Sequence, residues 1–271
     1  MTTFGARLAT AVAARGPLCV GIDPHPSLLD AWGLPDDAAG LERFALTTVD
    51  ALADGIAVLK PQSAFFERHG SAGIAVLERT VARATQAGAL VLLDVKRGDI
   101  GSTMTAYAEA YLADGAPLAV DAITASPYLG VGSLEPAFEL AGRTGRGVFV
   151  LARTSNPEGA AVQRGGVAQG VVDAIAQRNA GVRPLGHLGV VVGATVAPGE
   201  LDLDRLHGPV LAPGVGSQGG GVADLRSVFG AVLPDVLPST SRDVLRRGPD
   251  PAALRAAALR VRDLAAAVIG R

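Results

Sequence analysis

Short apolar runs recur along the chain and alternate with segments in which apolar residues return every three or four positions. The runs are continuous, which is typical of parallel strands covered on both faces. The segments between them have the period of amphipathic helices. Strands are predicted at 18–23, 55–62, 90–96, 119–126, 148–153, 188–194, 209–215 and 235–241. Helices are predicted, among others, at 41–54, 72–88, 103–115, 170–181 and 249–270.

Eight strands alternating with helices predict an α/β protein with a (β/α)8 TIM barrel. The alternative is a doubly wound open sheet, which would carry a G-x-G-x-x-G phosphate loop after its first strand. Here the first run continues as Gly21-Ile-Asp-Pro-His-Pro26, and the glycine-rich segment follows the seventh run. Barrels commonly bind phosphate after strands seven and eight, so we prefer the barrel.

The chain organisation predicts one domain. No linker of flexible composition divides the sequence, so we expect residues 1–271 to form a single (β/α)8 domain. A helix is expected before the first strand, at about 3–15, where Arg7 and Arg15 interrupt the apolar residues and argue against a signal peptide. Residues 24–40, rich in Pro, Asp and Gly, are predicted to form a long loop over the top of the barrel.

Composition narrows the class of protein. Hydrophobic residues make up 49% of the 271 residues and charged residues 18%, which excludes intrinsic disorder. A formal net charge of −2 gives no electrostatic case for nucleic-acid binding, and no stretch is apolar enough for a membrane span. The single cysteine, Cys19, excludes a disulfide framework and fits a cytoplasmic location. The four histidines are scattered, and we expect structural or solvated roles for them: His25, His69, His187 and His207.

Lysine is almost absent. Of the 24 lysine and arginine residues only Lys60 and Lys96 are lysines. Coding bias toward arginine is one explanation. The other is chemical, because lysine can give up its proton when its surroundings shift its pKa and arginine cannot. Both lysines are therefore candidates for catalysis.

Charged residues lie at the ends of the first three runs: Asp23, Lys60, and then Asp94 and Lys96, with Asp99 just beyond in the spacing Asp-x-Lys-x-x-Asp. In a barrel these strand ends converge on one mouth. Strand periodicity turns Asp94 and Lys96 to the same side, within reach of Lys60 on the neighbouring strand. Alternating lysines and aspartates stabilise one another's charges, and such a lysine can deliver a proton to carbon. A solvated surface ion-pair cluster is the alternative interpretation.

The opposite side of the mouth is suited to a phosphate group. The glycine-rich segment 212–221 lets backbone N–H groups approach an anion, and Arg242 follows the eighth run. The alternative for a glycine-rich segment alone is a flexible connection.

Three motifs together resemble the orotidine 5′-phosphate decarboxylase family, in its longer bacterial branch: Asp94-Val-Lys-Arg-Gly-Asp-Ile100, Lys60-Pro61 and Pro213-Gly-Val-Gly-Ser-Gln-Gly219. The resemblance extends from Asp23 to Arg242. It implies a homodimeric barrel, a carboxy-lyase that converts orotidine 5′-phosphate to UMP in the last step of de novo UMP biosynthesis. It also implies that no metal and no organic cofactor takes part.

The resemblance also implies residue roles. Lys96 would protonate C6 of the pyrimidine, and Asp94 would face the substrate carboxylate. Lys60 would bind the ribose hydroxyls together with Asp23 and would also join the charged network. Asp99 would reach into the neighbouring subunit's site. Substrate contacts would come from Asp23 at the ribose, Ile100 and Thr103 across the dimer, and Ser155 at the pyrimidine edge. Gln218 and Arg242 would hold the phosphate with the backbone of Gly219 and Gly220, and Pro213 and Val215 would be further substrate contacts.

Two other functions share the barrel. A magnesium-dependent sugar-phosphate decarboxylase or synthase would use the same Asp-x-Lys-x-x-Asp pattern, with an extra acidic metal ligand near the end of strand two. This chain has Lys60-Pro-Gln62 there, and the adjacent lysines would oppose a divalent cation at Asp94. A non-catalytic phosphate-binding barrel would have lost part of the acid and lysine set, which is complete here.

Overall fold

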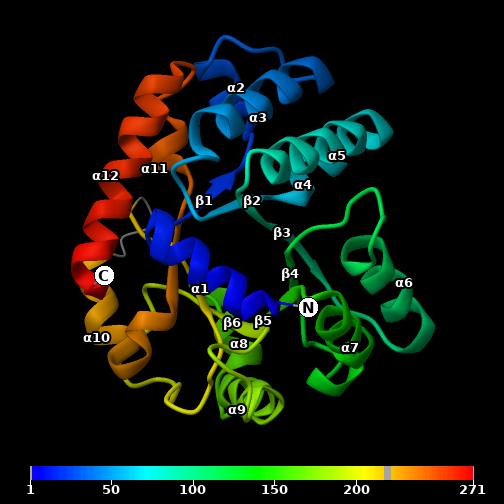
Figure 1. The fold of residues 1–271 in the computed structure, drawn as a ribbon, viewed down its shortest axis with the longest axis vertical. Helices are drawn as coiled ribbons and strands as arrows, with labels where there is room; N and C mark the ends of the chain where they lie inside the picture. The colour runs from blue at the N-terminus through cyan, green and yellow to red at the C-terminus, as the bar shows by residue number, and fades with distance from the viewer. Residues whose placement is uncertain (1, 217–220, 271) are drawn as a thin grey trace.

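Eight parallel strands close into a barrel in chain order, each paired with the next and β8 paired with β1. The computed structural model describes residues 2–216 and 221–270. Figure 1 shows the helices surrounding the strands. The strands are β1 (Cys19–Ile22), β2 (Val58–Pro61), β3 (Leu90–Arg97), β4 (Ala122–Ala125), β5 (Gly147–Arg153), β6 (Leu188–Val192), β7 (Val210–Pro213) and β8 (Val236–Thr240). The prediction of a (β/α)8 barrel is confirmed, and one strand lies at each predicted run, with β3 and β5 each extending one residue beyond it.

The helices follow the predicted segments to within a few residues. The α-helices are α1 (Phe4–Arg15), α2 (Pro26–Ala31), α3 (Ala38–Leu52), α4 (Ser63–Glu67), α5 (Gly70–Gln86), α6 (Gly101–Leu112), α7 (Glu135–Thr144), α8 (Ala160–Gln163), α9 (Val167–Asn179), α10 (Leu225–Phe229), α11 (Arg242–Leu245) and α12 (Pro251–Ile269). Short 3-10 helices are η1 (Val131–Leu134), η2 (Pro157–Gly159), η3 (Val222–Asp224) and η4 (Gly230–Asp235). The alternation is broken once, because residues 193–209 between β6 and β7 contain no helix.

The expectation of a long loop at 24–40 is wrong in part. Residues 26–31 form α2, and α3 already begins at Ala38. Pro26 stands at the first helical position, where its missing N–H costs nothing, and Leu28 and Leu29 are buried against the core. The density of Pro, Asp and Gly reflects two helix starts close together rather than an extended loop.

Helix α1 covers the amino-terminal end of the barrel, where Figure 1 shows it crossing in front of the strands. Thr3 caps the helix by accepting a hydrogen bond from the N–H of Ala6. The ring of Phe4 packs edge-on against Phe149 of β5, with ring centroids 5.9 Å apart. Gly147 leaves room for this contact, since a Cβ there would lie 2.4 Å from the Phe4 ring. The barrel is therefore closed at this end.

Two apolar layers make up the core. A smaller cluster fills the barrel interior beneath α1, and a larger one lies between the strands and the surrounding helices. Successive residues of a strand point to opposite sides, so Leu92 faces the interior while Leu93 faces the helices. In the part of the chain that the structure describes, no helix is long and apolar enough to cross a membrane.

Candidate active site

The carboxylate of Asp94 is the centre of a charged cluster at the carboxyl end of the barrel. Its Oδ2 lies 3.0 Å from Nζ of Lys60, and its Oδ1 lies 2.6 Å from Nζ of Lys96. The hydroxyl of Thr124, at the end of β4, donates a hydrogen bond of 2.8 Å to the same Oδ1. Three neighbouring strands thus aim four polar side chains at one point.

Two of these groups are buried charges. Lys60 and Asp94 are each 7% exposed, whereas the side chain of Lys96 is 45% exposed. Burial alone would raise the pKa of Asp94, but the positive charges of Lys60 and Lys96 and the hydrogen bonds that it accepts hold this pKa far below its usual range. Burial alone would lower the pKa of Lys60, but the carboxylates of Asp94 and Asp23 raise it above its usual value. Asp94 and Lys60 therefore stay ionised at neutral pH.

The backbone around Lys96 departs from a regular strand. The pairing of β3 with β4 shifts register between Leu93 and Arg97, and Lys96 has a φ of 47°. A residue with a β-carbon rarely adopts this left-handed conformation, which is held here by the Lys96 N–H donating to Thr124 Oγ1 at 2.9 Å. Within this irregular part of β3, Nζ of Lys96 contacts Oδ1 of Asp94, two residues earlier.

A cavity of about 330 Å³ opens beside the cluster. Its lining comes from both sides of the mouth: Asp23, His25, Lys60, Gln62, Asp94, Pro213, Gly214, Val215, Ser239, Thr240, Ser241 and Arg242. Among residues 2–216 and 221–270, three buried oxygens of this lining have no hydrogen-bond partner: Asp23 Oδ1, Thr240 Oγ1 and Ser241 Oγ. Buried polar groups are normally paired, so these three are suited to a polar ligand.

The structure brings the two halves of the predicted site together. Asp23, Lys60 and Asp94 share the cavity with Pro213, Val215 and Arg242 from the β7 and β8 side. Arg242 is exposed and is the first residue of α11, next to the unpaired hydroxyl of Ser241. Gln218, Gly219 and Gly220 lie outside the described residues.

Five of the predicted residues within the described ranges are absent from the lining of the cavity: Lys96, Asp99, Ile100, Thr103 and Ser155. Lys96 lies next to the lining through its 2.6 Å contact with Asp94 Oδ1. Asp99, Ile100 and Thr103 lie between the end of β3 and the first turns of α6, and Ile100 is 61% exposed. Ser155 is exposed on the loop that follows β5. Asp99, Ile100 and Thr103 are at least partly exposed, and the cavity of their own chain does not include them.

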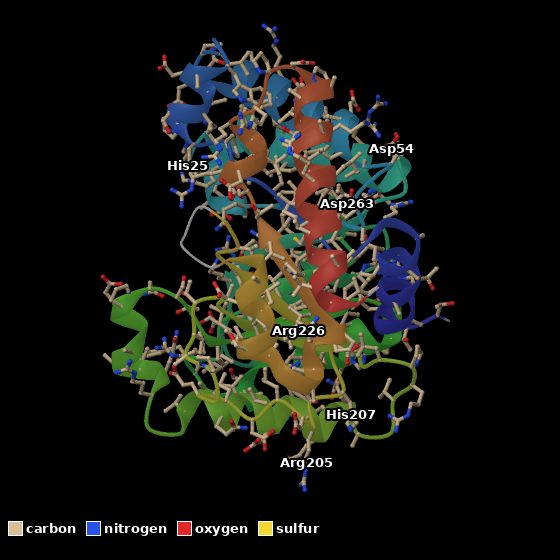
Figure 2. The ribbon with its side chains drawn as sticks, turned by 90° about the vertical axis from the view of Figure 1, so that its left-hand side faces the viewer. His25, Asp54, Arg205, His207, Arg226 and Asp263 are labelled. Carbon is tan, nitrogen blue, oxygen red and sulfur yellow. The ribbon has the colours of Figure 1, made fainter. Side chains whose placement is uncertain are left out.

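Sequence reasoning missed Thr124 and His25. Thr124 is a polar residue near the end of the fourth apolar run, so the rule that selected Asp94 would have found it. His25 was expected to be structural or solvated, yet it lines the cavity and packs against Phe65, with ring centroids 4.2 Å apart. Figure 2 shows His25 at the opposite end of the barrel from α1. Its position two residues after Asp23 is the signal in the sequence.

The arrangement suits proton delivery and anion binding. An ammonium group fixed against a carboxylate can hold a proton beside a reacting carbon and stabilise negative charge developing there. Among the described residues, no group of three or more His, Cys, Asp or Glu side chains is placed to hold a metal ion.

Comparisons with known proteins agree with this chemistry. The model of the orotidine 5′-phosphate decarboxylase / HUMPS family matches residues 16–256. A protein of Salinispora arenicola named orotidine 5′-phosphate decarboxylase is 65% identical over the full length of both chains. A crystal structure from Streptomyces avermitilis, assigned to the same activity, superposes with a TM-score of 0.97 at 58% identity, covering 100% of this chain and 97% of that one. The OMP decarboxylase of Leishmania donovani gives a TM-score of 0.78 at 30% identity, with both chains covered completely.

Proposed function

The chain belongs to the orotidine 5′-phosphate decarboxylase / HUMPS family, and we propose that Lys96 protonates C6 as the enzyme converts orotidine 5′-phosphate to UMP. The relatives that match over the full length carry this activity in their names, and the activity makes the protein a carboxy-lyase of pyrimidine biosynthesis. The observation that carries the assignment of roles is the carboxylate of Asp94, held between Nζ of Lys60 and Nζ of Lys96.

The reaction breaks the bond between C6 and the carboxylate carbon. The electron pair stays on C6, and CO₂ leaves. The ammonium of Lys96 stabilises this developing carbanion and then donates a proton from Nζ to C6, after which the lysine regains a proton from solvent. Asp94 orients Lys96 through the 2.6 Å contact and faces the substrate carboxylate, while Lys60 keeps Asp94 ionised. None of these steps requires a metal or an organic cofactor.

Binding uses groups around the cavity. Asp23, whose buried Oδ1 has no partner among the described residues, accepts hydrogen bonds from the ribose hydroxyls. Arg242 binds the phosphate, with Pro213 and Val215 beside it, and Gln218, Gly219 and Gly220 are assigned to the same group from the sequence motif. Ser155 contacts the pyrimidine edge. Binding energy from the remote phosphate contributes to holding the reacting centre in place.

We also propose a homodimer in which Asp99 of one subunit completes the site of the other. The exposure of Ile100 and the absence of Asp99 and Thr103 from the lining of their own cavity support this arrangement. The test mixes inactive Lys96→Ala and Asp99→Ala subunits. Each mixed dimer would contain one intact site, so statistical mixing restores roughly one quarter of wild-type activity. No recovery after subunit exchange would exclude a shared site.

The cellular location and the domain organisation are part of the same proposal. We place the enzyme in the cytoplasm, because its single cysteine is buried and its substrate is a soluble nucleotide. Residues 1–271 are taken as one domain, supported by the pairing of β8 with β1, which joins the two ends of the chain.

The reaction is tested by adding orotidine 5′-phosphate to EDTA-treated protein and following the pyrimidine absorbance. Conversion to UMP is the expected result. UMP binding without conversion would instead favour a non-catalytic phosphate-binding barrel. Absence of both would favour a magnesium-dependent sugar-phosphate enzyme, although Lys60-Pro-Gln62 stands where that class needs a further acidic ligand.

A further inference from the structure

A buried arginine ties the loop that carries Ser155 to the barrel. Arg153 is the last residue of β5 and is only 8% exposed. Its Nε donates to Glu200 Oε1 at 2.6 Å, and its Nη1 donates to the carbonyl oxygen of Thr154 at 2.8 Å and to Gln163 Oε1 at 3.3 Å. One guanidinium therefore joins the end of β5, the segment after β6 and helix α8.

Gln163 holds the same loop from its other side. Its Oε1 accepts a hydrogen bond from the N–H of Thr154 at 2.9 Å, and its Nε2 donates to Thr154 Oγ1 at 2.8 Å. The Thr154 hydroxyl lies 2.6 Å from Asn156 Oδ1 and donates to it. Gly159 is needed beneath this contact, because a Cβ there would lie 2.9 Å from both Gln163 Oε1 and Thr154 Oγ1. The two residues that flank Ser155 are thus both fixed.

Ser155 itself packs over the end of β6. A Cβ at Gly193 would lie 3.1 Å from the backbone nitrogen of Ser155 and 3.2 Å from its Cβ, so a side chain there would displace the serine. The N–H of Gly193 donates to the carbonyl oxygen of Arg153 at 2.8 Å, which continues the pairing of β5 with β6 beyond the register shift at Leu151. Ser155 is therefore held both by its contact with Gly193 after β6 and by the fixed neighbours Thr154 and Asn156.

We propose that Arg153, held by Glu200 and Gln163, is a positioning residue that sets Ser155 over the mouth of the barrel to meet the pyrimidine edge. The inference rests on the proposed role of Ser155 in substrate binding. Arg153 is buried but Glu200 is exposed, and an ion pair open to solvent on one side contributes little net stability, so the geometry that it fixes is the better explanation for this cluster. The hydrogen bond from Arg153 lowers the pKa of Glu200, which keeps the pair ionised.

The test is a double-mutant cycle between Glu200 and Ser155, with kcat and KM for orotidine 5′-phosphate as readouts. Glu200→Gln keeps the shape of the side chain but removes the charge that orients Arg153. We expect it to lower kcat/KM about tenfold, because small displacements of a substrate contact are costly. In a Ser155→Ala background the same change should cost less than about twofold, since the group being positioned is gone. A purely structural role would give equal losses in both backgrounds.

The matched control is Glu135→Gln. Glu135 accepts hydrogen bonds from Nε and Nη2 of Arg178 at 3.1 and 2.8 Å, between α7 and α9. We expect this variant to stay within about twofold of wild-type kcat/KM. The positioning role is refuted if Glu200→Gln has no effect, if Ser155→Ala has none, or if their effects multiply independently. A wild-type enzyme that fails to decarboxylate the substrate would overturn the proposed function itself, and this inference with it.

Discussion

The two ends of the barrel are built from the same strands but carry opposite chemistry. At the amino end the inward positions include Cys19, Leu92 and Phe149, all buried beneath α1. Two residues further along β3, on the same face, Asp94 replaces Leu92 as the inward side chain. That step along a strand is only about 6.6 Å, yet it separates a closed apolar interior from a buried ion-pair cluster.

The two ends differ in how burial of their side chains affects the stability of the fold. The apolar end gains free energy by removing side chains from water, and burial there raises the pKa of the Cys19 thiol to about 12, so it stays protonated and inert. The charged end must desolvate Lys60 and Asp94, which is unfavourable unless both stay paired. Stability and chemistry should therefore respond to different substitutions at the two ends.

The largest effect is expected at the charged end, from Lys96→Ala. Removing both the stabilising charge and the proton donor should lower kcat by at least about 10⁴-fold. Because the Lys96 side chain is 45% exposed, the free energy of unfolding should change by less than about 1 kcal/mol. Absorbance assays measure kcat, urea unfolding measures the free energy of unfolding, and UMP titration measures nucleotide binding.

The control for Lys96→Ala is Arg205→Ala. Figure 2 shows Arg205 pointing into solvent far from His25, so removal of this cation should leave activity and binding unchanged. Near-normal turnover by the Lys96 variant would refute the mechanism.

Phe4→Ala tests the apolar end. The change removes the edge-on contact with Phe149 and leaves a cavity under α1, so we expect the free energy of unfolding to fall by about 3–5 kcal/mol. KM for orotidine 5′-phosphate should not change at a temperature where the variant is folded. Leu264→Ala, at a leucine that is 58% exposed, is the control and should alter stability by less than about 0.5 kcal/mol. A raised KM in the Phe4 variant would show that the two ends are coupled.

Asp94→Asn should lower both the stability of the fold and the catalytic activity. It leaves Lys60 buried without its closest counter-charge, which should cost about 3 kcal/mol of unfolding free energy, and it releases Lys96 from its 2.6 Å contact. Asp114→Asn is the matched surface change, since Asp114 pairs with Arg146 but its side chain is 68% exposed, and it should cost less than about 1 kcal/mol. If the two variants were equally stable, the cluster at Asp94 would not behave as a buried one.

Sequence patterns predicted the barrel because eight continuous apolar runs with a helical period between them admit few other folds. They also predicted that Asp23, Lys60 and Asp94 would meet, because parallel strands in a barrel end at one mouth. They could not place Lys96 in its left-handed conformation, since the bulge depends on the pairing of β3 with β4. Nor did they reveal Arg153, whose partners Gln163 and Glu200 are 10 and 47 residues away.

A smaller effect is expected from Thr124→Val, which removes a hydroxyl shared by the cluster. That hydroxyl donates to Asp94 Oδ1 and accepts from the N–H of Lys96, so its loss should reduce the free energy of unfolding by about 1–2 kcal/mol and also lower kcat. The control is Thr80→Val in α5, where the hydroxyl bonds to the carbonyl oxygen of Val76 four residues earlier and activity should be unaffected. Equal kcat values for the two variants would show that Thr124 does not align Lys96.

The smallest expected effect is the pH dependence of the Asp94–Lys60 pair. The pKa of Asp94 is lowered on folding, so its contribution is fully present above the unfolded value of about 3.9 and is lost as the pH falls through the lower folded value. The pKa of Lys60 is raised, so its contribution is fully present below about 10.4 and is lost only as the pH rises through the higher folded value. The difference in unfolding free energy between wild type and Asp94→Asn should therefore stay constant from about pH 5 to pH 9, and it should narrow below about pH 4. Urea unfolding at intervals of one pH unit measures it, with Asp114→Asn as the reference. A difference that varied around neutral pH would mean that Asp94 or Lys60 titrates there. The contacts of the pair would then shift the pKa values of these two groups less than the structure indicates.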